Sequence, residues 1–243
     1  MQRKILVIQH DEDVPLGNFY DWILEFDKNI VFDIVNARKD KIPFDYNCPV
    51  IILGGENNAY DDLPKDGHIS CPWLGAEKKL ISSLVRNNVP VLGICLGFQL
   101  GTVALGGKVE VAHSRGREFG GTRLYLSALA DLDPVFSPAC KYFKSSDIFV
   151  TEFHSDCVVS LPEGARILAS SDKYIQSLRC GSFIGVQFHP EANFDSVSNW
   201  ATNYADKHSI IASFVDNKDC IEKFAKFIAQ GFISECTHFW DLQ

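Results

Sequence analysis

A cysteine between a predicted buried strand and a predicted helix constrains this chain more than any other feature. Residues 89–94 form a short apolar run of the kind that makes a buried strand, and residues 96–105 are typical of a helix. Cys95 therefore lies on a sharp turn, and Gly93 and Gly97 on either side allow the backbone to bend tightly. This is the geometry of a nucleophile elbow, with cysteine in place of serine. It places the sulfur at a helix N-terminus, where free N–H groups and the helix dipole favour a thiolate over a thiol.

A second segment supplies a general base for such a nucleophile. Residues 183–188 are predicted to form another buried strand, so His189 and Glu191 lie at its C-terminal end. In a parallel α/β sheet the carboxyl ends of the strands share one edge, where such folds bind their ligands. Because Cys95 and His189 each follow a strand, we expect them to meet at that edge. Glu191 is close enough in sequence to hold the imidazole in one tautomer and to stabilise its charged form.

The order of the predicted elements favours an α/β fold. Short apolar runs predict strands over residues 4–9, 30–35, 50–53 and 90–94. Helical patterns separate them near residues 17–27 and 73–88, and such alternation implies a parallel sheet covered by helices on both sides. Beyond residue 108 the pattern changes to short strands with turns, of which the clearest are 166–170, 174–179 and 183–188.

The last part of the chain is predicted to be helical. One helix is expected over residues 196–206, followed by a longer one that extends to residue 229. The longer helix carries an apolar stripe that is typical of core packing, formed by Ile221, Phe224, Phe227 and Ile228. Gly231 is predicted to cap this helix, and residues 232–243 are predicted to be a tail.

Two segments together resemble the class I (triad) glutamine amidotransferases. They are Gly-Ile-Cys-Leu-Gly-Phe-Gln at 93–99 and Phe-His-Pro-Glu at 188–191. Enzymes of that family use a Cys-His-Glu triad to release ammonia from the glutamine side chain through a γ-glutamyl thioester. The resemblance runs from about residue 4 to residue 200. It is closest to the stand-alone, GMP-synthase-like branch, which is marked by Gln-His at 9–10 and Ala-Tyr-Asp-Asp at 59–62.

The resemblance implies both a fold and a catalytic triad. The expected fold is a flavodoxin-like, doubly wound, mostly parallel sheet with helices on both faces and a small antiparallel subsheet. It is expected to form a single domain over residues 1–243. Cys95, His189 and Glu191 match the family's catalytic residues, with the cysteine as nucleophile, the histidine as base and the glutamate as the group that orients it.

The same resemblance implies further site residues. The backbone N–H groups of Gly55 and Leu96 correspond to the donors of an oxyanion hole. Gln99 and the segment 154–156 (His154, Ser155 and Asp156) correspond to positions that help to bind the glutamyl group, although Gln99 also fits an ordinary helix residue bonded to nearby backbone. Glu56 stands where many relatives have proline, which changes the rim of the pocket and leaves the N–H donor in place.

Each of these residues also has a purely structural interpretation. One cysteine among eight is, by itself, more often a small buried hydrophobic residue than a nucleophile. A His-Pro-Glu sequence at a strand end is more often a surface turn, and two glycines after an apolar run usually form a loop. Their occurrence together, in the expected order and each at a strand end, favours the triad.

Composition excludes several classes of function. A formal net charge of −8 and the absence of a basic stripe argue against non-specific nucleic-acid binding. No apolar stretch is long enough to span a bilayer, so no membrane association is expected. Eight cysteines without paired spacing indicate reduced thiols in a cytoplasmic protein. No His/Cys cluster has the spacing of zinc ligands, and we predict neither a metal nor a cofactor.

Three functions remain open at this stage. The chain contains neither a Gly-rich P-loop nor a second large domain that would consume ammonia. It is therefore expected to be an amidotransferase that passes ammonia to a separate synthetase, a free-standing hydrolase of γ-glutamyl peptides or conjugates, or a regulatory module with an unused site. The intact triad counts against the third. The first two share every catalytic residue, and glutamine or another γ-glutamyl small molecule is the expected substrate of both.

Overall fold

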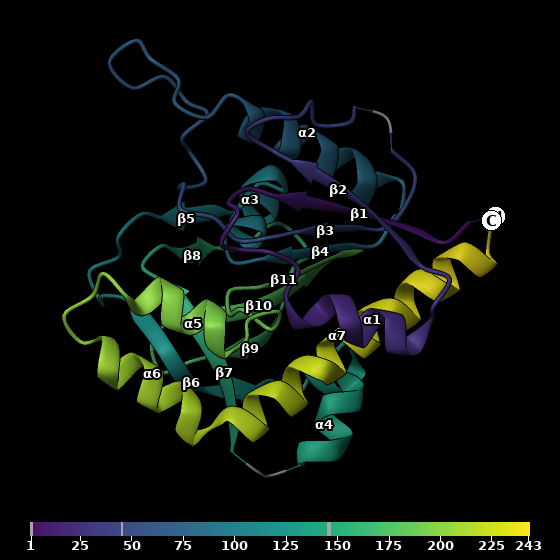
Figure 1. Cartoon of the computed structure of the whole chain (residues 1–243). Coiled ribbons are helices and arrows are strands. Elements are labelled where there is room, and N and C mark those ends of the chain that lie inside the picture. Colours follow the sequence, from purple (N-terminus) through teal and green to yellow (C-terminus); the bar gives the residue numbers. More distant parts are fainter. Residues whose placement is uncertain (1, 45, 145–146) are drawn as a thin grey trace.

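The structure is built on one large sheet (Figure 1). The computed structural model describes residues 2–44, 46–144 and 147–243. Within these residues nine strands form a sheet of order β2-β1-β3-β4-β11-β10-β9-β6-β7, and β5 pairs with β8 in a separate two-stranded sheet. The strands are β1 (Lys4–Gln9), β2 (Val31–Asn36), β3 (Val50–Ile52), β4 (Val91–Ile94), β5 (Lys108–Glu110), β6 (Glu118–Leu126), β7 (Ile148–His154), β8 (Cys157–Ser160), β9 (Arg166–Ser170), β10 (Ile175–Cys180) and β11 (Phe183–Val186).

One half of the large sheet is parallel and the other half is antiparallel. The parallel half comprises β2, β1, β3, β4 and β11, and β10, β9, β6 and β7 extend it with antiparallel pairings. β11 belongs to both halves, because it runs parallel to β4 and antiparallel to β10. The predicted doubly wound α/β fold with a small antiparallel sheet is confirmed.

Helices cover both faces of the parallel half. The helices of the described residues are α1 (Asn18–Phe26), α2 (Trp73–Arg86), α3 (Leu96–Ala104), α4 (Ser137–Phe143), α5 (Phe194–Ala201), α6 (Lys207–Asp216) and α7 (Lys218–Asp241). In Figure 1, α2 and α3 lie on one side of the sheet and α1 and α7 on the other. Among the described residues, no helix combines the length and the apolar character needed to cross a membrane.

The side chains of β1 point alternately into two hydrophobic cores, one on each face of the sheet. Ile5 and Val7 pack with the apolar faces of α1 and α7, whereas Leu6 and Ile8 pack with those of α2 and α3. Successive side chains of a strand point to opposite faces, so a strand covered on both sides is apolar throughout. This accounts for the continuous apolar run at the start of the chain.

The strand order reverses at β1, which pairs with β2 on one side and with β3 on the other. Connections that leave the neighbouring strands at this point diverge and open a crevice at the carboxyl edge of the sheet. The segments that follow β3, β4 and β11 meet at this edge, and they carry the Gly54–Gly55 turn, Cys95 and His189. The fold therefore brings the predicted nucleophile and base to one place.

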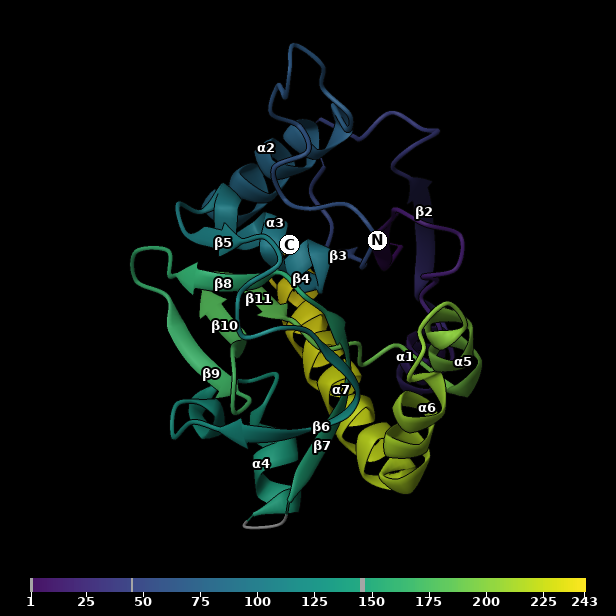
Figure 2. The same ribbon diagram turned by 90° about the vertical axis from the view of Figure 1, so that its left-hand side faces the viewer.

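The C-terminal region differs from the prediction. The helix expected over 196–206 ends at Ala201, and a separate helix, α6, follows it; the two lie side by side in Figures 1 and 2. The predicted cap at Gly231 and the predicted tail were wrong, because α7 continues through Gly231 to Asp241. A Cβ atom at Gly231 would lie 2.3 Å from the backbone oxygen of Val135. Close approach to this segment, rather than helix termination, explains the glycine.

Replacement of Gly231 tests this explanation. Alanine is favoured over glycine inside a helix by about 1 kcal/mol, but here its methyl group overlaps the Val135 backbone. We therefore expect Gly231→Ala to lower the free energy of unfolding by about 1–3 kcal/mol, as overpacking does. Urea unfolding measures the change. The neighbouring Gln230→Ala is the control and should change stability by about 0.5 kcal/mol or less. Equal or higher stability of Gly231→Ala would contradict the close contact.

Candidate active site

Cys95 lies between β4 and α3 with strained backbone angles. Its φ of 50° and ψ of −104° are rare for a residue with a side chain. The bend is thus made at the cysteine itself. The neighbouring glycines serve close packing instead: a Cβ at Gly93 would lie 2.5 Å from the Gly97 oxygen, and one at Gly97 would lie 2.2 Å from the Ile52 oxygen. These contacts allow the N-terminus of α3 to sit directly over the strand ends.

His189 is held between Glu191 and Cys95. Its Nδ1 lies 2.7 Å from Oε1 of Glu191, and both side chains are buried. Its backbone N–H donates to the Thr151 oxygen at 2.7 Å, which ties the residue to β7. Burial by itself lowers the pKa of His189, but the charges of Glu191 and Cys95 and hydrogen bonds to both raise this pKa well above its usual value. The geometry therefore favours an imidazolium beside the sulfur.

The Gly54–Gly55 turn packs against this pair. A Cβ at Gly54 would lie 2.7 Å from Cε1 of His189 and 3.4 Å from Cβ of Cys95, so only glycine fits. In the described part of the chain, the backbone N–H groups of Gly55 and Leu96 donate to no protein acceptor. Glu56, at the position that departs from the family pattern, donates its own backbone N–H to a carboxylate oxygen of Asp11 at 2.9 Å.

The expected substrate-binding residues form a connected group beside the cysteine. The Gln99 amide donates to the Asp156 carbonyl at 3.4 Å and to Oε1 of Gln187 at 3.3 Å. The Asp156 carbonyl also accepts from Nδ1 of His154 at 2.9 Å, and the Asp156 carboxylate accepts from the backbone of Ala112 at 2.9 Å. The structure thus brings Gln99 and all three residues of the 154–156 segment to the wall of one pocket.

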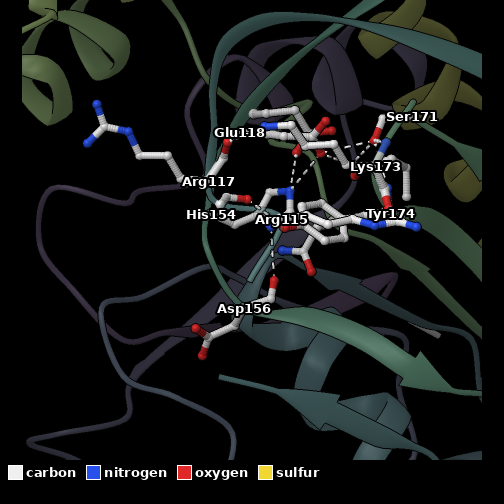
Figure 3. A network of polar contacts seen from close by, with 12 residues as sticks. Arg115, Arg117, Glu118, His154, Asp156, Ser171, Lys173 and Tyr174 are labelled. Carbon is white, nitrogen blue, oxygen red and sulfur yellow. Dashed lines mark hydrogen bonds and ion pairs between the residues drawn. The ribbon is translucent and has the colours of Figure 1, made fainter. Parts of the chain in front are cut away.

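His154 is further held by two buried carboxylates. Its Nε2 lies 3.3 Å from Glu152 and 3.4 Å from Glu118 (Figure 3). Burial lowers the pKa of His154, but the two carboxylates outweigh this effect and raise its pKa to about 10. Glu118 also accepts hydrogen bonds from Ser171 and Gln176, at 3.0 and 2.7 Å. Both ring nitrogens of His154 therefore face protein acceptors. The cationic side chain, which belongs to β7, links this strand to Glu118 of β6.

The pocket at Cys95 has a volume of about 430 Å³ and an aromatic wall. The wall consists of Phe119, Phe153, Trp200 and Tyr204. The rings of Phe119 and Phe153 stack with centroids 4.0 Å apart, and the Trp200 ring lies 4.7 Å from the His189 ring. Sequence reasoning missed this wall. Its members are far apart in sequence and meet because β6 pairs with β7 and because Trp200 and Tyr204 pack on Phe153.

The other cysteines differ from Cys95 in setting. All eight lie in the described part of the chain and are free thiols. Burial raises the pKa of each of the other seven thiols. Among the residues that the structure describes, no group of three or more His, Cys, Asp or Glu side chains is arranged to hold a metal ion.

Comparison with known proteins shows the family of this chain. Residues 30–199 match the family model of class-I glutamine amidotransferases. The chain is 35% identical over 153 residues to the glutamine-hydrolysing GMP synthase of Bacillus pumilus; the match covers 62% of this chain and 25% of that sequence. It is 33% identical over 150 residues to one subunit of the glutamine-hydrolysing GMP synthase of Sulfurisphaera tokodaii, covering 60% of this chain and 68% of that protein.

A solved structure extends the similarity over nearly the whole chain. The crystal structure of a glutamine amidotransferase from Thermotoga maritima superposes with a TM-score of 0.75 and 25% identity, covering 97% of this chain and 98% of the other. By contrast, the chain spans about a quarter of the length of the bacterial GMP synthases that it matches. The family match covers more than half of the chain and contains both Cys95 and His189. The chain belongs to the class-I glutamine amidotransferase family.

Proposed function

We propose that this chain is an enzyme that cleaves a γ-glutamyl amide bond through a thioester on Cys95. The observation that carries the proposal is the row formed by Cys95, His189 and Glu191 at the carboxyl edge of the sheet. The imidazole lies beside Cys95, against the same Gly54 position, and its Nδ1 lies 2.7 Å from the Glu191 carboxylate. A nucleophile, a base and an orienting group in contact are the signature of covalent catalysis.

The first half of the reaction forms the acyl enzyme. The thiolate of Cys95 attacks the side-chain carboxamide carbon, and the carbonyl oxygen becomes an oxyanion. The free backbone N–H groups of Gly55 and Leu96 stabilise this oxyanion; the loss of one such donor typically costs a factor of about 10² to 10³ in rate. His189 then gives its proton to the nitrogen, the C–N bond breaks, and ammonia or an amine leaves.

The second half regenerates the enzyme. Neutral His189 removes a proton from a water molecule, whose oxygen adds to the thioester carbon. The C–S bond then breaks, glutamate leaves, and the thiolate is restored beside the imidazolium. Glu191 keeps the ring in one orientation through both halves and stabilises its charged form.

The glutamyl group is proposed to bind beside Gln99 and the 154–156 segment. In this wall Ser155 is exposed and Asp156 is half-buried, whereas the buried His154 ring contacts Glu118 and Glu152. We therefore assign contact with substrate to Gln99, Ser155 and Asp156. His154 is assigned the support of this wall.

The acceptor of the released nitrogen distinguishes two forms of this function. In the first, ammonia passes to a separate synthetase in the cytoplasm, and the similarity to one subunit of a GMP synthase supports this form. In the second, the enzyme is a free-standing γ-glutamyl hydrolase. The aromatic wall favours this alternative, because Trp200 packs on His189, the residue that protonates the leaving nitrogen. A substituent on that nitrogen would extend along Trp200 and Phe153.

A substrate comparison distinguishes the two forms. Purified protein is assayed with L-glutamine, γ-glutamyl dipeptides and S-benzyl glutathione. Preference for γ-glutamyl compounds with apolar leaving groups supports the hydrolase. Turnover of glutamine alone, stimulated by a synthetase, supports the amidotransferase.

Replacement of the nucleophile is the first test of the shared chemistry. We expect Cys95→Ala to abolish release of ammonia or amine from every γ-glutamyl substrate, with unchanged far-UV circular dichroism. Turnover is followed by glutamate release. Cys236→Ala, at another buried cysteine, is the matched control and should keep catalysis. Wild-type turnover by Cys95→Ala would show that the nucleophile is wrongly assigned.

Chemical labelling gives an independent test of the same thiol. A diazo-ketone analogue of glutamine is expected to modify Cys95 before the other seven cysteines, whose thiol pKa values are raised by burial. Peptide mapping by mass spectrometry after partial reaction identifies the labelled residue. Earlier modification of Cys140 or Cys236 would count against a uniquely activated thiolate.

A double-mutant cycle tests the link between base and carboxylate. Glu191→Gln should lower turnover clearly, and His189→Ala should lower it much further. The double variant should be hardly worse than His189→Ala, because residues that act as one unit are strongly non-additive. Steady-state kinetics of the three variants on the best substrate measures this. Additive losses, or no loss in Glu191→Gln, would leave a Cys–His dyad in place of a triad.

A further inference from the structure

A third buried histidine that contacts a glutamate lies behind the Gly54–Gly55 turn. His10 directly follows β1, and Glu77 comes from the otherwise apolar inner face of α2. Both side chains are fully buried, with 0% exposure, and Nε2 of His10 lies 2.9 Å from Oε2 of Glu77. Nδ1 of the same ring lies 3.1 Å from the carbonyl oxygen of Gly54. The proposed reaction steps use neither residue.

The partners of His10 determine where its protons are. The Gly54 carbonyl can only accept a hydrogen bond, so Nδ1 carries a proton and donates it. The Glu77 carboxylate likewise accepts a hydrogen bond from Nε2–H, so the two contacts together require a proton on each ring nitrogen. Burial lowers the pKa of His10, but Glu77 and the Gly54 carbonyl raise it above its usual value. An imidazolium that donates at both nitrogens satisfies both contacts.

A hydrogen bond to the Gly54 oxygen also orients the Gly55 N–H. These two groups belong to one peptide unit, and in a trans peptide they point in opposite directions. Within the described residues every peptide bond is trans. The Gly55 N–H is therefore turned away from His10, and Gly55 lines the pocket together with Cys95. The hydrogen bond from His10 to the Gly54 oxygen therefore directs the Gly55 N–H, at the opposite side of the same peptide, toward the site of the proposed oxyanion.

A turn of two glycines needs such a contact. Glycine adopts alternative backbone conformations at little cost, so this peptide could rotate and present its oxygen to the pocket. In the rotated form the Gly55 N–H would face Nδ1–H of His10, donor against donor. A larger residue does not fit at position 55, because a Cβ there would lie 2.8 Å from Cβ of His10 and 3.2 Å from Cδ2 of Leu96.

We propose that His10 and Glu77 are positioning residues that hold the Gly54–Gly55 peptide with its N–H directed at the substrate oxygen. This inference rests on the proposed function, because the orientation matters only where an oxyanion forms. A merely structural pair would join β1 to α2 and affect stability alone. The two roles predict different kinetics.

Two double variants separate these roles. His10→Leu/Glu77→Leu removes the donor to Gly54 without leaving an unpaired buried charge, which single replacements would do at a high cost in stability. His10→Asn/Glu77→Leu differs from it by one nearly isosteric side chain, whose amide N–H can replace Nδ1–H. Both are compared with the wild type, using γ-glutamyl-p-nitroanilide and L-glutamine as substrates.

The readouts distinguish oxyanion stabilisation from general damage. Alkylation of Cys95 by iodoacetamide displaces iodide at a saturated carbon and forms no oxyanion, so it reports the state of the thiolate alone. For His10→Leu/Glu77→Leu we expect kcat to fall by about a hundredfold, the range for a lost oxyanion donor. KM and the alkylation rate should stay within about twofold. His10→Asn/Glu77→Leu should recover at least tenfold of the lost kcat.

Three results would overturn the inference. They are equal kcat values in the two double variants, wild-type kcat in His10→Leu/Glu77→Leu, and an alkylation rate that falls in parallel with kcat. If the wild type is active and one of these results is obtained, the inference fails but the proposed function stands. A wild-type protein that turns over neither substrate overturns the proposed function itself, and this inference with it.

Discussion

Close packing at two glycines determines where Cys95 lies in this protein. A side chain at Gly93 would overlap the backbone of Gly97, and one at Gly97 would overlap the carbonyl of Ile52. Only with both glycines does α3 begin directly over the ends of β3 and β4. The helix N-terminus, and Cys95 with it, then opens at the carboxyl edge of the parallel strands. His189, the glycine turn and the pocket wall lie beside Cys95 because the helix begins there.

The second constraint on this edge is the burial of charge. Three buried histidines lie at or behind this edge, and each contacts at least one buried carboxylate: His10, His154 and His189. An uncompensated charge is very costly in a protein interior, so a buried imidazolium needs such a partner. The three pairs nevertheless serve different ends. His189 lies beside Cys95, His154 lies in the pocket wall, and His10 contacts the Gly54 carbonyl of the glycine turn.

The parts of the site that could be predicted are those with local signals. Cys95 stands between an apolar run and a helical pattern, and His189 follows another apolar run, so their positions at strand ends followed from patterns of a few residues. The structure brings the two together because β11 pairs with β4. Gly231 shows the limit of such reasoning. Glycine commonly ends helices, but here the deciding contact is with Val135, almost a hundred residues earlier.

The sequence by itself determined the succession of strands and helices, the α/β fold and the residues at the strand ends, because periodicity and apolar runs act over short distances. Only the tertiary structure decided which distant side chains line the same pocket wall or contact each other in the interior. The stacking of Phe119 on Phe153 depends on the β6–β7 register, and the contact of Glu77 with His10 depends on how α2 packs over β1. Neither has a local pattern, because strand register and helix packing are set by contacts across the whole sheet.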